Sequence, residues 1–359
     1  MSDTAPPDLR PGISAALTDE LAVRRAEVAA IDARLLPDLD LLIDFATAGG
    51  KMLRAQFLCH GFRAGSHPAG RSLSAPVWRV AAALELIQAC ALLHDDIIDR
   101  SDTRRGRPST HRAVAAAHAG AGDPAHLGES VALLLGDFAL AWADDVFVAA
   151  AAELAALDRT LPLWRAMRTE VLAGQLLDLA VTARPAADPA AQEHDALQVN
   201  RFKTAAYTVA RPLQLGAALA GGSAAVLAAL GDYGHAIGSA FQLRDDQLGV
   251  FGDPGTTGKP AGGDLLEGKR TVLLARTRAA LADRPAALAE LDAALAAAEP
   301  DTVARLTARI AASGAPDQIE TMITELTAIG LAALDPQVID AGTVEVLTAL
   351  AERATTRSS

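Results

Sequence analysis

Two short aspartate clusters contain the residues of this chain that are best suited to chemistry. The first, Asp95-Asp96-Ile97-Ile98-Asp99, follows an apolar stretch at residues 84–93 that has the spacing of a helix. On a helix Asp95 and Asp99 share a face, and Asp96 lies beside them. Three carboxylates there repel one another, and the negative end of the helix dipole disfavours them further. A hard cation such as Mg²⁺ would relieve this repulsion, whereas a solvated acidic helix end is the alternative interpretation.

The second cluster is Asp245-Asp246, which also follows an apolar helical stretch, about 150 residues further along the chain. Helices of a bundle can bring two such clusters face to face across the core. A cavity of this kind would hold several divalent cations and, with them, a polyanion. The two clusters therefore predict a polyanionic substrate.

A polyanion also needs basic residues, and these occur in compact groups around the two clusters. The groups are Lys51 and Arg54 after Gly49-Gly50, then Arg104-Arg105 and Arg107, Lys203 beside Thr204, Lys259 after Gly258, and Lys269-Arg270 after Gly268. Arg and Lys are the usual partners of diphosphate groups. Each group alone is more typical of a solvated surface, so it is their order around the aspartates that indicates a diphosphate site.

The composition predicts one large all-α domain over residues 1–359, with frayed termini that include residues 353–359. The chain has 359 residues, of which 51% are hydrophobic and 4% aromatic. Ala and Leu dominate, and no stretch alternates with period two, so we expect a bundle of ten or more helices. Helix-breaking residues predict loops near 65–75, 104–112, 119–128, 183–192 and 252–268. None of these is long enough to separate two cores.

The charge balance and the cysteines exclude several classes of protein. A net charge of −12, from 32 basic and 44 acidic residues, argues against nucleic-acid binding. Cys59 and Cys90 cannot build a disulfide framework, and they favour a reducing compartment, the cytoplasm. The first residues lack the basic and apolar regions of a signal peptide. An uncharged run at residues 212–231 reaches membrane length, but Gly221-Gly222 interrupts it, so we expect two core helices and no membrane span.

With these motifs in this order, the chain resembles the trans-isoprenyl diphosphate synthases of the polyprenyl synthetase family. The resemblance runs from about Gly49 to Thr271 and is strongest to bacterial geranylgeranyl diphosphate synthases. The matching elements are Gly49-Gly50-Lys51 with Arg54, the first aspartate cluster with Asp102-Thr103-Arg104-Arg105-Gly106, Gly174-Gln175-Leu176-Leu177-Asp178, and Asp245-Asp246 with Gly252-Asp253 and Gly258-Lys259. Any one of these elements is weak alone, but together they are specific.

The resemblance implies a helical bundle around a deep central cavity, in a homodimer that joins an allylic diphosphate head to tail to isopentenyl diphosphate. It also implies a role for each matching residue. Asp95, Asp96, Asp99 and Asp245 would hold three Mg²⁺ ions on the allylic diphosphate, with Asp246 nearby, and Arg104, Lys203 and Lys259 would contact the same group. Lys51, Arg54, Gln88 and Arg105 would bind isopentenyl diphosphate. Thr204, Gln242 and Gln175 would line the reacting carbons, and Lys269 would lie at the mouth.

One position departs from the family pattern. Gly249 stands where the second motif usually carries an aspartate, and glycine has no side chain to bind a metal. The sequence offers Asp253, in the following loop, as a substitute ligand.

The residues before the first cluster predict the length of the product. One helical turn rises about 5.4 Å, close to one prenyl unit, and the turn before Asp95 carries Cys90 and Ala91. In the family a bulky aromatic residue there stops the chain at fifteen carbons. These two residues are small, and the next turn offers Ile87, so we expect geranylgeranyl diphosphate. A longer polyprenyl product and farnesyl diphosphate are the alternatives.

Two other functions share part of this pattern. A class I terpene cyclase also has an aspartate-rich helix, but it needs a second Asn/Ser/Glu metal triad. Here Asn200 and Thr204 are followed by Thr208 instead of Glu, and aromatic residues are few. A non-catalytic subunit of a heteromeric synthase would have lost the first cluster, which is intact here. His94 and Cys90 are more typical of packing than of a metal ligand or a nucleophile.

Overall fold

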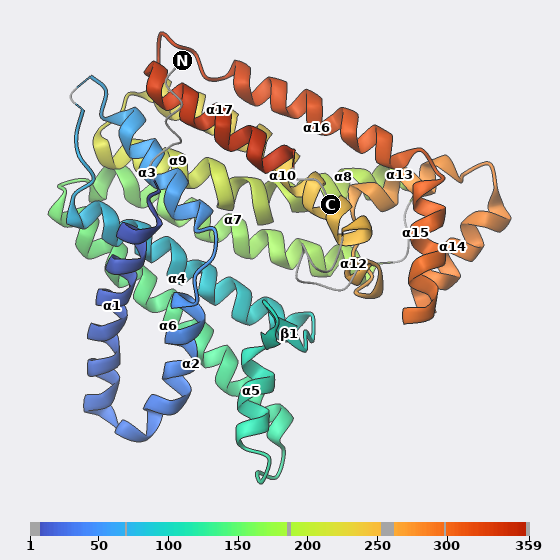
Figure 1. Cartoon of the computed structure of the whole chain (residues 1–359), viewed down its shortest axis with the longest axis horizontal. Coiled ribbons are helices and arrows are strands. Elements are labelled where there is room, and N and C mark those ends of the chain that lie inside the picture. The colour runs from blue at the N-terminus through green and yellow to red at the C-terminus, as the bar shows by residue number, and fades with distance from the viewer. Residues whose placement is uncertain (1–7, 69, 185–187, 253–261, 298, 357–359) are drawn as a thin grey trace. The chain divides into compact units, whose positions relative to one another are not determined.

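The computed structural model describes residues 8–68, 70–184, 188–252, 262–297 and 299–356. Within these ranges the secondary structure is almost entirely helical, which confirms the all-α expectation (Figure 1). One small exception is a hairpin of β1 (Thr103–Arg104) and β2 (Arg107–Pro108), which the sequence analysis missed. Lys259 and Asp253 lie outside the described residues.

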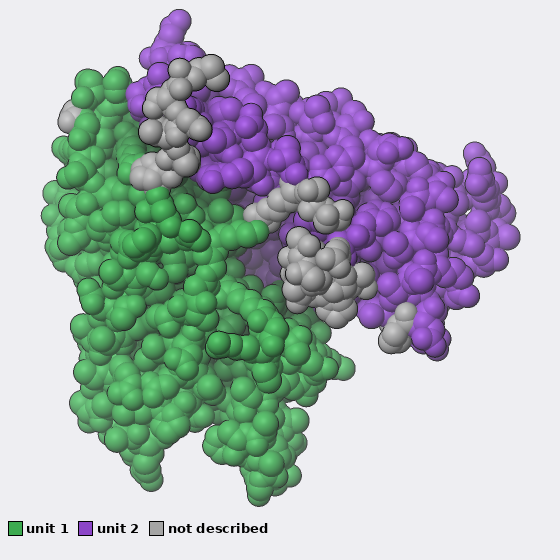
Figure 2. Space-filling model, viewed as in Figure 1, with its two compact units in different colours: residues 1–162, 212–223 green, residues 163–211, 224–359 purple. Residues whose placement is uncertain are grey.

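The described chain forms two compact units (Figure 2). Unit 1 contains residues up to Pro162 together with Pro212–Ser223, and unit 2 contains Leu163–Arg211 and the residues from Ala224 onward. The chain therefore passes between the units three times. A single domain stays a prediction.

Unit 1 is built around the apolar helix α4. Its elements are α1 (Arg10–Ile31), η1 (Ala33–Leu35), α2 (Leu36–Thr47), α3 (Leu53–Gly65), α4 (Ala75–Ile98), the hairpin, α5 (Thr110–Ala117), α6 (Pro124–Glu153), the start of α7 (Leu157–Ala183), and most of α9 (Arg211–Ala220). Helices α1, α2, α3, α5 and α6 pack against α4. Among the described helices α4 alone is long and apolar enough to cross a membrane, and most of that apolar window is buried, as in a core helix.

The local sequence explains where α4 begins. Ser74 is the N-cap residue in an extended conformation, and Pro76 lies in the first turn, where its fixed φ suits a helix. Val80, Leu84 and Leu93 are fully buried, so packing on several sides stabilises the helix. The helix ends at Ile98, and the first aspartate cluster therefore occupies its last turn.

Glycines let α9 pack directly on α3. A β-carbon at Gly61 would lie 2.1 Å from the carbonyl oxygen of Leu213, and one at Gly216 would lie 1.9 Å from that of Leu58. The two backbones are thus in contact, and any larger residue would force them apart. Helix α9 ends at Ala220 and the next helix begins at Ala224, so the expectation of two helices in the uncharged run is confirmed.

Unit 2 is organised around α10. Its elements are the rest of α7, α8 (Pro189–Val199), η2 (Asn200–Ala210), α10 (Ala224–Phe251), α12 (Gly263–Leu266), α13 (Val272–Ala280), α14 (Pro285–Ala297), η3 (Pro300–Thr302), α15 (Val303–Ala311), α16 (Ala315–Ala332) and α17 (Ala341–Thr355). Helix α10 packs against η2, α12, α13, α16 and α17. The second aspartate cluster lies in the last two turns of α10.

Five expectations about helix ends need correction. The loop expected at 183–192 contains the start of α8, and the loop expected at 252–268 contains the whole of α12. The loop expected at 119–128 ends earlier, because the Asp123 side chain accepts a hydrogen bond from the His126 backbone and α6 begins at Pro124. The loop expected at 104–112 contains the hairpin and the start of α5. Helix α17 continues to Thr355 instead of fraying from Arg353, since Thr355 is buried and its carbonyl accepts a 2.8 Å hydrogen bond from Arg244 Nε.

Candidate active site

The first aspartate cluster is held by a neighbouring arginine. Asp96 is almost fully buried, and Arg104 in β1 donates hydrogen bonds to its Oδ1 atom from Nε, at 2.8 Å, and from Nη2. The Arg104 Nη2 atom also lies 3.6 Å from Asp95 Oδ2. Asp99 is the C-cap residue of α4, where its backbone N–H bonds to the Asp95 carbonyl. The hairpin therefore delivers a positive charge to the end of α4, where three carboxylates gather.

Burial raises the pKa of Asp96, and the hydrogen bonds from Arg104 act in the opposite direction. The second carboxylate oxygen, Asp96 Oδ2, is buried and has no hydrogen-bond partner among the described residues. An unsatisfied carboxylate oxygen of this kind suits a hard cation such as Mg²⁺.

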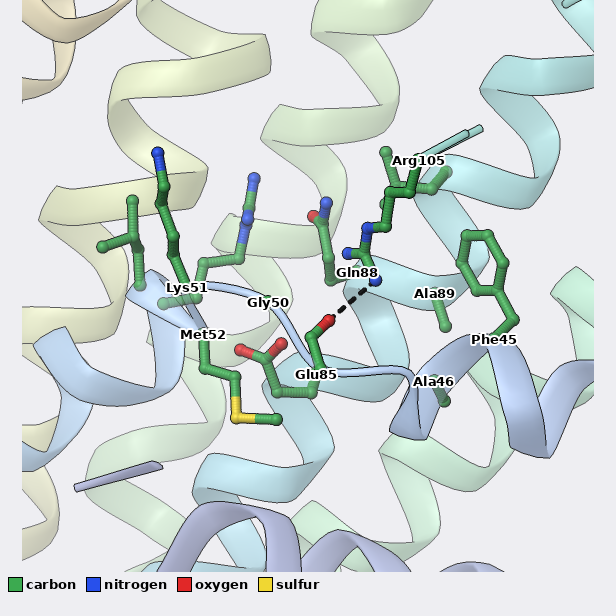
Figure 3. A pocket seen from close by; sticks show the side chains of 13 residues that line it. Phe45, Ala46, Gly50, Lys51, Met52, Glu85, Gln88, Ala89 and Arg105 are labelled. Carbon is green, nitrogen blue, oxygen red and sulfur yellow. Dashed lines mark hydrogen bonds between the residues drawn. The ribbon is translucent and has the colours of Figure 1, made fainter. Parts of the chain in front are cut away.

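A pocket of about 110 Å³ in unit 1 brings together the four residues expected to bind isopentenyl diphosphate (Figure 3). Lys51 comes from the segment just before α3, Arg54 from its first turn, Gln88 from α4, and Arg105 from the turn of the hairpin. The pocket is also lined by Phe45, Ala46, Gly49, Gly50, Met52, Leu53, Glu85, Ala89 and Leu92. Three cations and an amide around one small cavity can bind an anion of the size of a diphosphate.

Unusual backbone conformations place these cations. Gly49, Gly50 and Met52 have φ values of 83°, 144° and 43°, in the segment just before α3 begins. Arg105 and Gly106, with φ values of 53° and 73°, form the two central residues of the hairpin turn, as a type I′ turn requires. A non-glycine residue with positive φ stores strain, which is common at functional sites.

The Arg105 side chain is fixed in this arrangement. Its Nη1 atom donates a 2.8 Å hydrogen bond to the Gly49 carbonyl, shown as the dashed line in Figure 3. Its guanidinium also lies over the Phe45 ring, 5.8 Å from the ring centre. A β-carbon at Gly50 would lie 3.4 Å from the Arg105 Nη2 atom, so a larger residue there would crowd the guanidinium.

Glu85 is a residue of this pocket that the sequence analysis missed. Its carboxylate accepts the backbone N–H of Ala55, in the first turn of α3, where Met52 as N-cap makes no side-chain hydrogen bond. Burial raises its pKa, and the nearby charges of Arg54 and Arg105 lower it. Glu85 thus stabilises the N-terminus of α3 and lies near two of the pocket's cations. The available signal was that Glu85 is the one charged residue in the apolar stretch at residues 84–93.

In unit 2 the structure links three of the expected site residues. Thr204 Oγ1 donates a 2.7 Å hydrogen bond to Gln242 Oε1, and Gln242 Nε2 donates one of 2.7 Å to Asp246 Oδ1. Thr204 and Lys203 lie in η2, which has π-helical hydrogen bonding, a feature frequent at functional sites. Lys203 Nζ forms a 2.8 Å ion pair with Asp178 on α7.

Gly174 explains how α7 approaches η2 so closely. A β-carbon at Gly174 would lie 2.5 Å from the backbone nitrogen of Lys203. Gln175, the next residue, is half-buried on the same helix. The segment Gly174–Asp178 thus positions the Lys203 side chain through both backbone packing and the ion pair.

Burial raises the pKa of Asp246 to about 7. The Gln242 hydrogen bond and Lys269 lower it, and the charges of Asp264 and Asp245 raise it. Asp246 is 5% exposed, and its Oδ2 atom has no hydrogen-bond partner within the described part of the chain. Lys269 lies beside this cluster, where it forms ion pairs with Asp264 at 3.1 Å and Glu267 at 2.7 Å.

The residues expected to set product length lie in the turns of α4 before the aspartates. Cys90 and Ile87 are buried and Ala91 is half-buried. Burial raises the pKa of the Cys90 thiol to about 12, so it stays protonated and unreactive. His94 lies 3.1 Å from the Leu133 carbonyl through Nε2, an arrangement typical of packing.

No three side chains of His, Cys, Asp or Glu among the described residues converge into a group that could hold a metal ion unaided. This agrees with the coordination chemistry of Mg²⁺, which commonly binds through one or two carboxylates, water and substrate phosphates. The buried carboxylate oxygens of Asp96 and Asp246 fit such a role.

Comparison with known proteins identifies the class. Residues 39–311 match the model of the polyprenyl synthetase family. The geranylgeranyl diphosphate synthase of Mycobacterium tuberculosis is 34% identical over 71% of this chain and 67% of its own length. A short chain isoprenyl diphosphate synthase of Methanothermobacter thermautotrophicus is 33% identical over 66% of both chains. The matched region thus spans about two thirds of these curated relatives.

A solved structure covers more of the chain. The geranylgeranyl pyrophosphate synthase of Corynebacterium glutamicum, complexed with isoprenyl diphosphate and magnesium, is 46% identical, with a TM-score of 0.89 over 96% of this chain and 98% of its own. The fold is therefore that of the all-α isoprenoid synthases. The chain belongs to the polyprenyl synthetase family, the isoprenyl diphosphate synthases that act as trans-prenyltransferases. This membership sets aside the terpene cyclase interpretation.

Proposed function

We propose that this protein is a Mg²⁺-dependent synthase that joins isopentenyl diphosphate to an allylic diphosphate and releases geranylgeranyl diphosphate. The observation that carries the proposal is the pocket in which Lys51, Arg54, Gln88 and Arg105 meet. Side-chain cations alone bind the diphosphate of isopentenyl diphosphate in this pocket. That diphosphate does not leave in the reaction, so its site needs only affinity and orientation.

The allylic diphosphate is the leaving group, and its site needs stronger charge compensation. In this proposal, as the family resemblance implies, Asp95, Asp96, Asp99, Asp245 and Asp246 would hold three Mg²⁺ ions on it, and Arg104, Lys203 and Lys259 would contact its oxygens. When bound, the metal supplies Lewis-acid stabilisation of the charge that develops as the C–O bond breaks. Arg104 now donates hydrogen bonds to Asp96, and Lys203 to Asp178. In the proposed complex both side chains would donate hydrogen bonds to the diphosphate oxygens instead.

The remaining steps need orientation and a dry site. Thr204 holds the Gln242 amide in one orientation, and Gln242 in turn holds Asp246. With Gln175, these side chains flank the allylic cation that forms on ionisation. The double bond of isopentenyl diphosphate attacks this cation, and the released diphosphate accepts the proton that leaves. Lys269 lies at the mouth. Exclusion of water prevents the cation from being quenched.

Incubation with isopentenyl diphosphate, Mg²⁺ and either dimethylallyl, geranyl or farnesyl diphosphate, followed by chromatography of the products, tests this function. We expect twenty-carbon product, no turnover with EDTA, and a loss of several orders of magnitude in Asp96→Asn, which keeps side-chain volume but removes charge. Circular dichroism controls for helix content. Near-normal turnover in Asp96→Asn, or Mg²⁺-independent turnover in the wild type, would contradict the proposal.

The product length follows from the small residues Cys90 and Ala91 one turn before Asp95, with Ile87 on the next turn. We expect Ala91→Phe to fill the path of the growing chain and shift the main product toward fifteen carbons, while Ala91→Val, a smaller change, shifts it less. Product sizing with geranyl diphosphate as primer measures both. An active Ala91→Phe enzyme with an unchanged product profile would show that the tail does not pass this turn.

The homodimer is also part of the proposal. Helix α6 presents an exposed apolar stripe that includes Leu134 (57% exposed), Phe138 (37%) and Val148 (42%), spaced as one helical face. Within unit 2, α7 presents Leu172, Leu176 and Leu179 in the same way. Exposed apolar faces of this length are typical of surfaces that a second copy covers.

Light scattering should therefore give twice the 37.0 kDa mass of the chain. Leu134→Glu should lower the mass toward that of one chain, because burying a charge in an apolar interface is costly. Val23→Glu, the same kind of change at an exposed valine of α1, serves as the control and should stay dimeric. A monomeric wild type refutes the dimer.

A location in the cytoplasm stays a prediction from the sequence.

A further inference from the structure

We propose that Asp264, from α12, supplies the third carboxylate of the second aspartate cluster, in the place that the missing side chain of Gly249 leaves open. The inference rests on the proposed Mg²⁺-dependent function and names a further ligand for its metal. It also gives a reason for glycine at position 249, where the family pattern has an aspartate.

The first argument is the space that Asp264 occupies. Gly249 lies one turn after Asp245 on α10, so a side chain there would point along the same face as Asp245. A β-carbon built at Gly249 would lie 2.0 Å from Asp264 Oδ2 and 2.7 Å from its Cγ atom. Unbonded atoms in contact lie about 3.5–4.0 Å apart, so the carboxylate of Asp264 fills the place of the absent side chain.

The second argument is that the backbone fixes this arrangement. The N–H of Gly262 donates a 3.0 Å hydrogen bond to the carbonyl of Gly249, which ties the start of α12 to the end of α10. Gly262 has a φ of 74°, a conformation that glycine adopts without strain. The Lys269 N–H bonds to the Asp264 carbonyl at 3.0 Å, and Lys269 Nζ lies 3.1 Å from Asp264 Oδ1. Asp264 is thus held at both its backbone and its side chain.

The third argument is an oxygen atom that points to a ligand. Asp246 Oδ2 is buried without a hydrogen-bond partner among the described residues, in a side chain that is 95% buried. Asp264 and Asp245 are the charged carboxylates that act on Asp246. The unsatisfied Asp246 oxygen and the carboxylates of Asp245 and Asp264 that act on it suit a hard divalent cation that also binds water and substrate phosphates, with Lys269 as the neighbouring cation. Because Asp264 reaches the cluster from another helix, its carboxylate replaces the one that position 249 lacks.

A reciprocal exchange of the two positions tests the inference. Isothermal titration of Mg²⁺ into the protein with inorganic diphosphate measures metal affinity without turnover. We expect Asp264→Ala and Asp264→Asn to weaken Mg²⁺ binding about tenfold or more. Gly249→Ala should weaken it similarly, because the added β-carbon displaces the Asp264 carboxylate. The double variant Gly249→Asp with Asp264→Ala should recover most of the affinity, since it restores a carboxylate at that place.

Gly263→Ala is the matched control, because a β-carbon at Gly263 meets no atom within 4 Å and should leave Mg²⁺ affinity unchanged. Wild-type affinity in both Asp264 variants would overturn the inference. So would a double variant that binds Mg²⁺ no better than Asp264→Ala while keeping its helix content.

The assay separates this inference from the proposed function. A wild-type protein that forms no prenyl product overturns the function, whereas a productive wild type with unchanged Mg²⁺ affinity in the Asp264 variants overturns only the role of Asp264. Asp264→Asn keeps the side-chain volume, so it remains informative if Asp264→Ala fails to fold.

Discussion

A buried carboxylate needs a positive charge, and this requirement shapes the candidate site residues within each unit. Transfer of an ionised group from water to a protein interior costs several kcal/mol unless a counter-charge or hydrogen bonds compensate it. The buried Asp96 satisfies it with Arg104, and the half-buried Asp178 and Asp264 pair with Lys203 and Lys269. In the proposed function, each pair keeps in place charged groups that would bind a Mg²⁺–diphosphate complex.

Two different solutions to anion binding follow from this constraint. In unit 1, a pocket uses Lys51, Arg54 and Arg105, which unusual backbone turns bring to one cavity. In the proposed function, the aspartate clusters instead bind an anion only through divalent cations. The diphosphate of isopentenyl diphosphate stays attached through the proposed reaction, and the pocket of side-chain cations suits such a group. The allylic diphosphate is the leaving group. It suits a site with divalent cations, because a metal stabilises the charge that develops on it.

The aspartates and most of the cations of the proposed site could be predicted from the sequence, because each lies in a short motif of neighbouring residues. The all-α class could be predicted from composition, and the helix break at Gly221-Gly222 from the glycines themselves. The hairpin did not, because its turn places Arg105 at a positive φ, a conformation that sequence patterns assign to Gly or Asn. Glu85 and Asp264 were missed because their roles depend on contacts with Ala55 and Gly249, which belong to other helices.

The most direct test of the account compares how the two diphosphates bind. Calorimetry would measure binding of isopentenyl diphosphate, and of a thio analogue of geranyl diphosphate that does not ionise, each with and without Mg²⁺. The account predicts that isopentenyl diphosphate binds without Mg²⁺ and is weakened by Lys51→Ala, whereas the allylic analogue needs Mg²⁺. Binding of isopentenyl diphosphate that requires Mg²⁺ and ignores Lys51→Ala would contradict it.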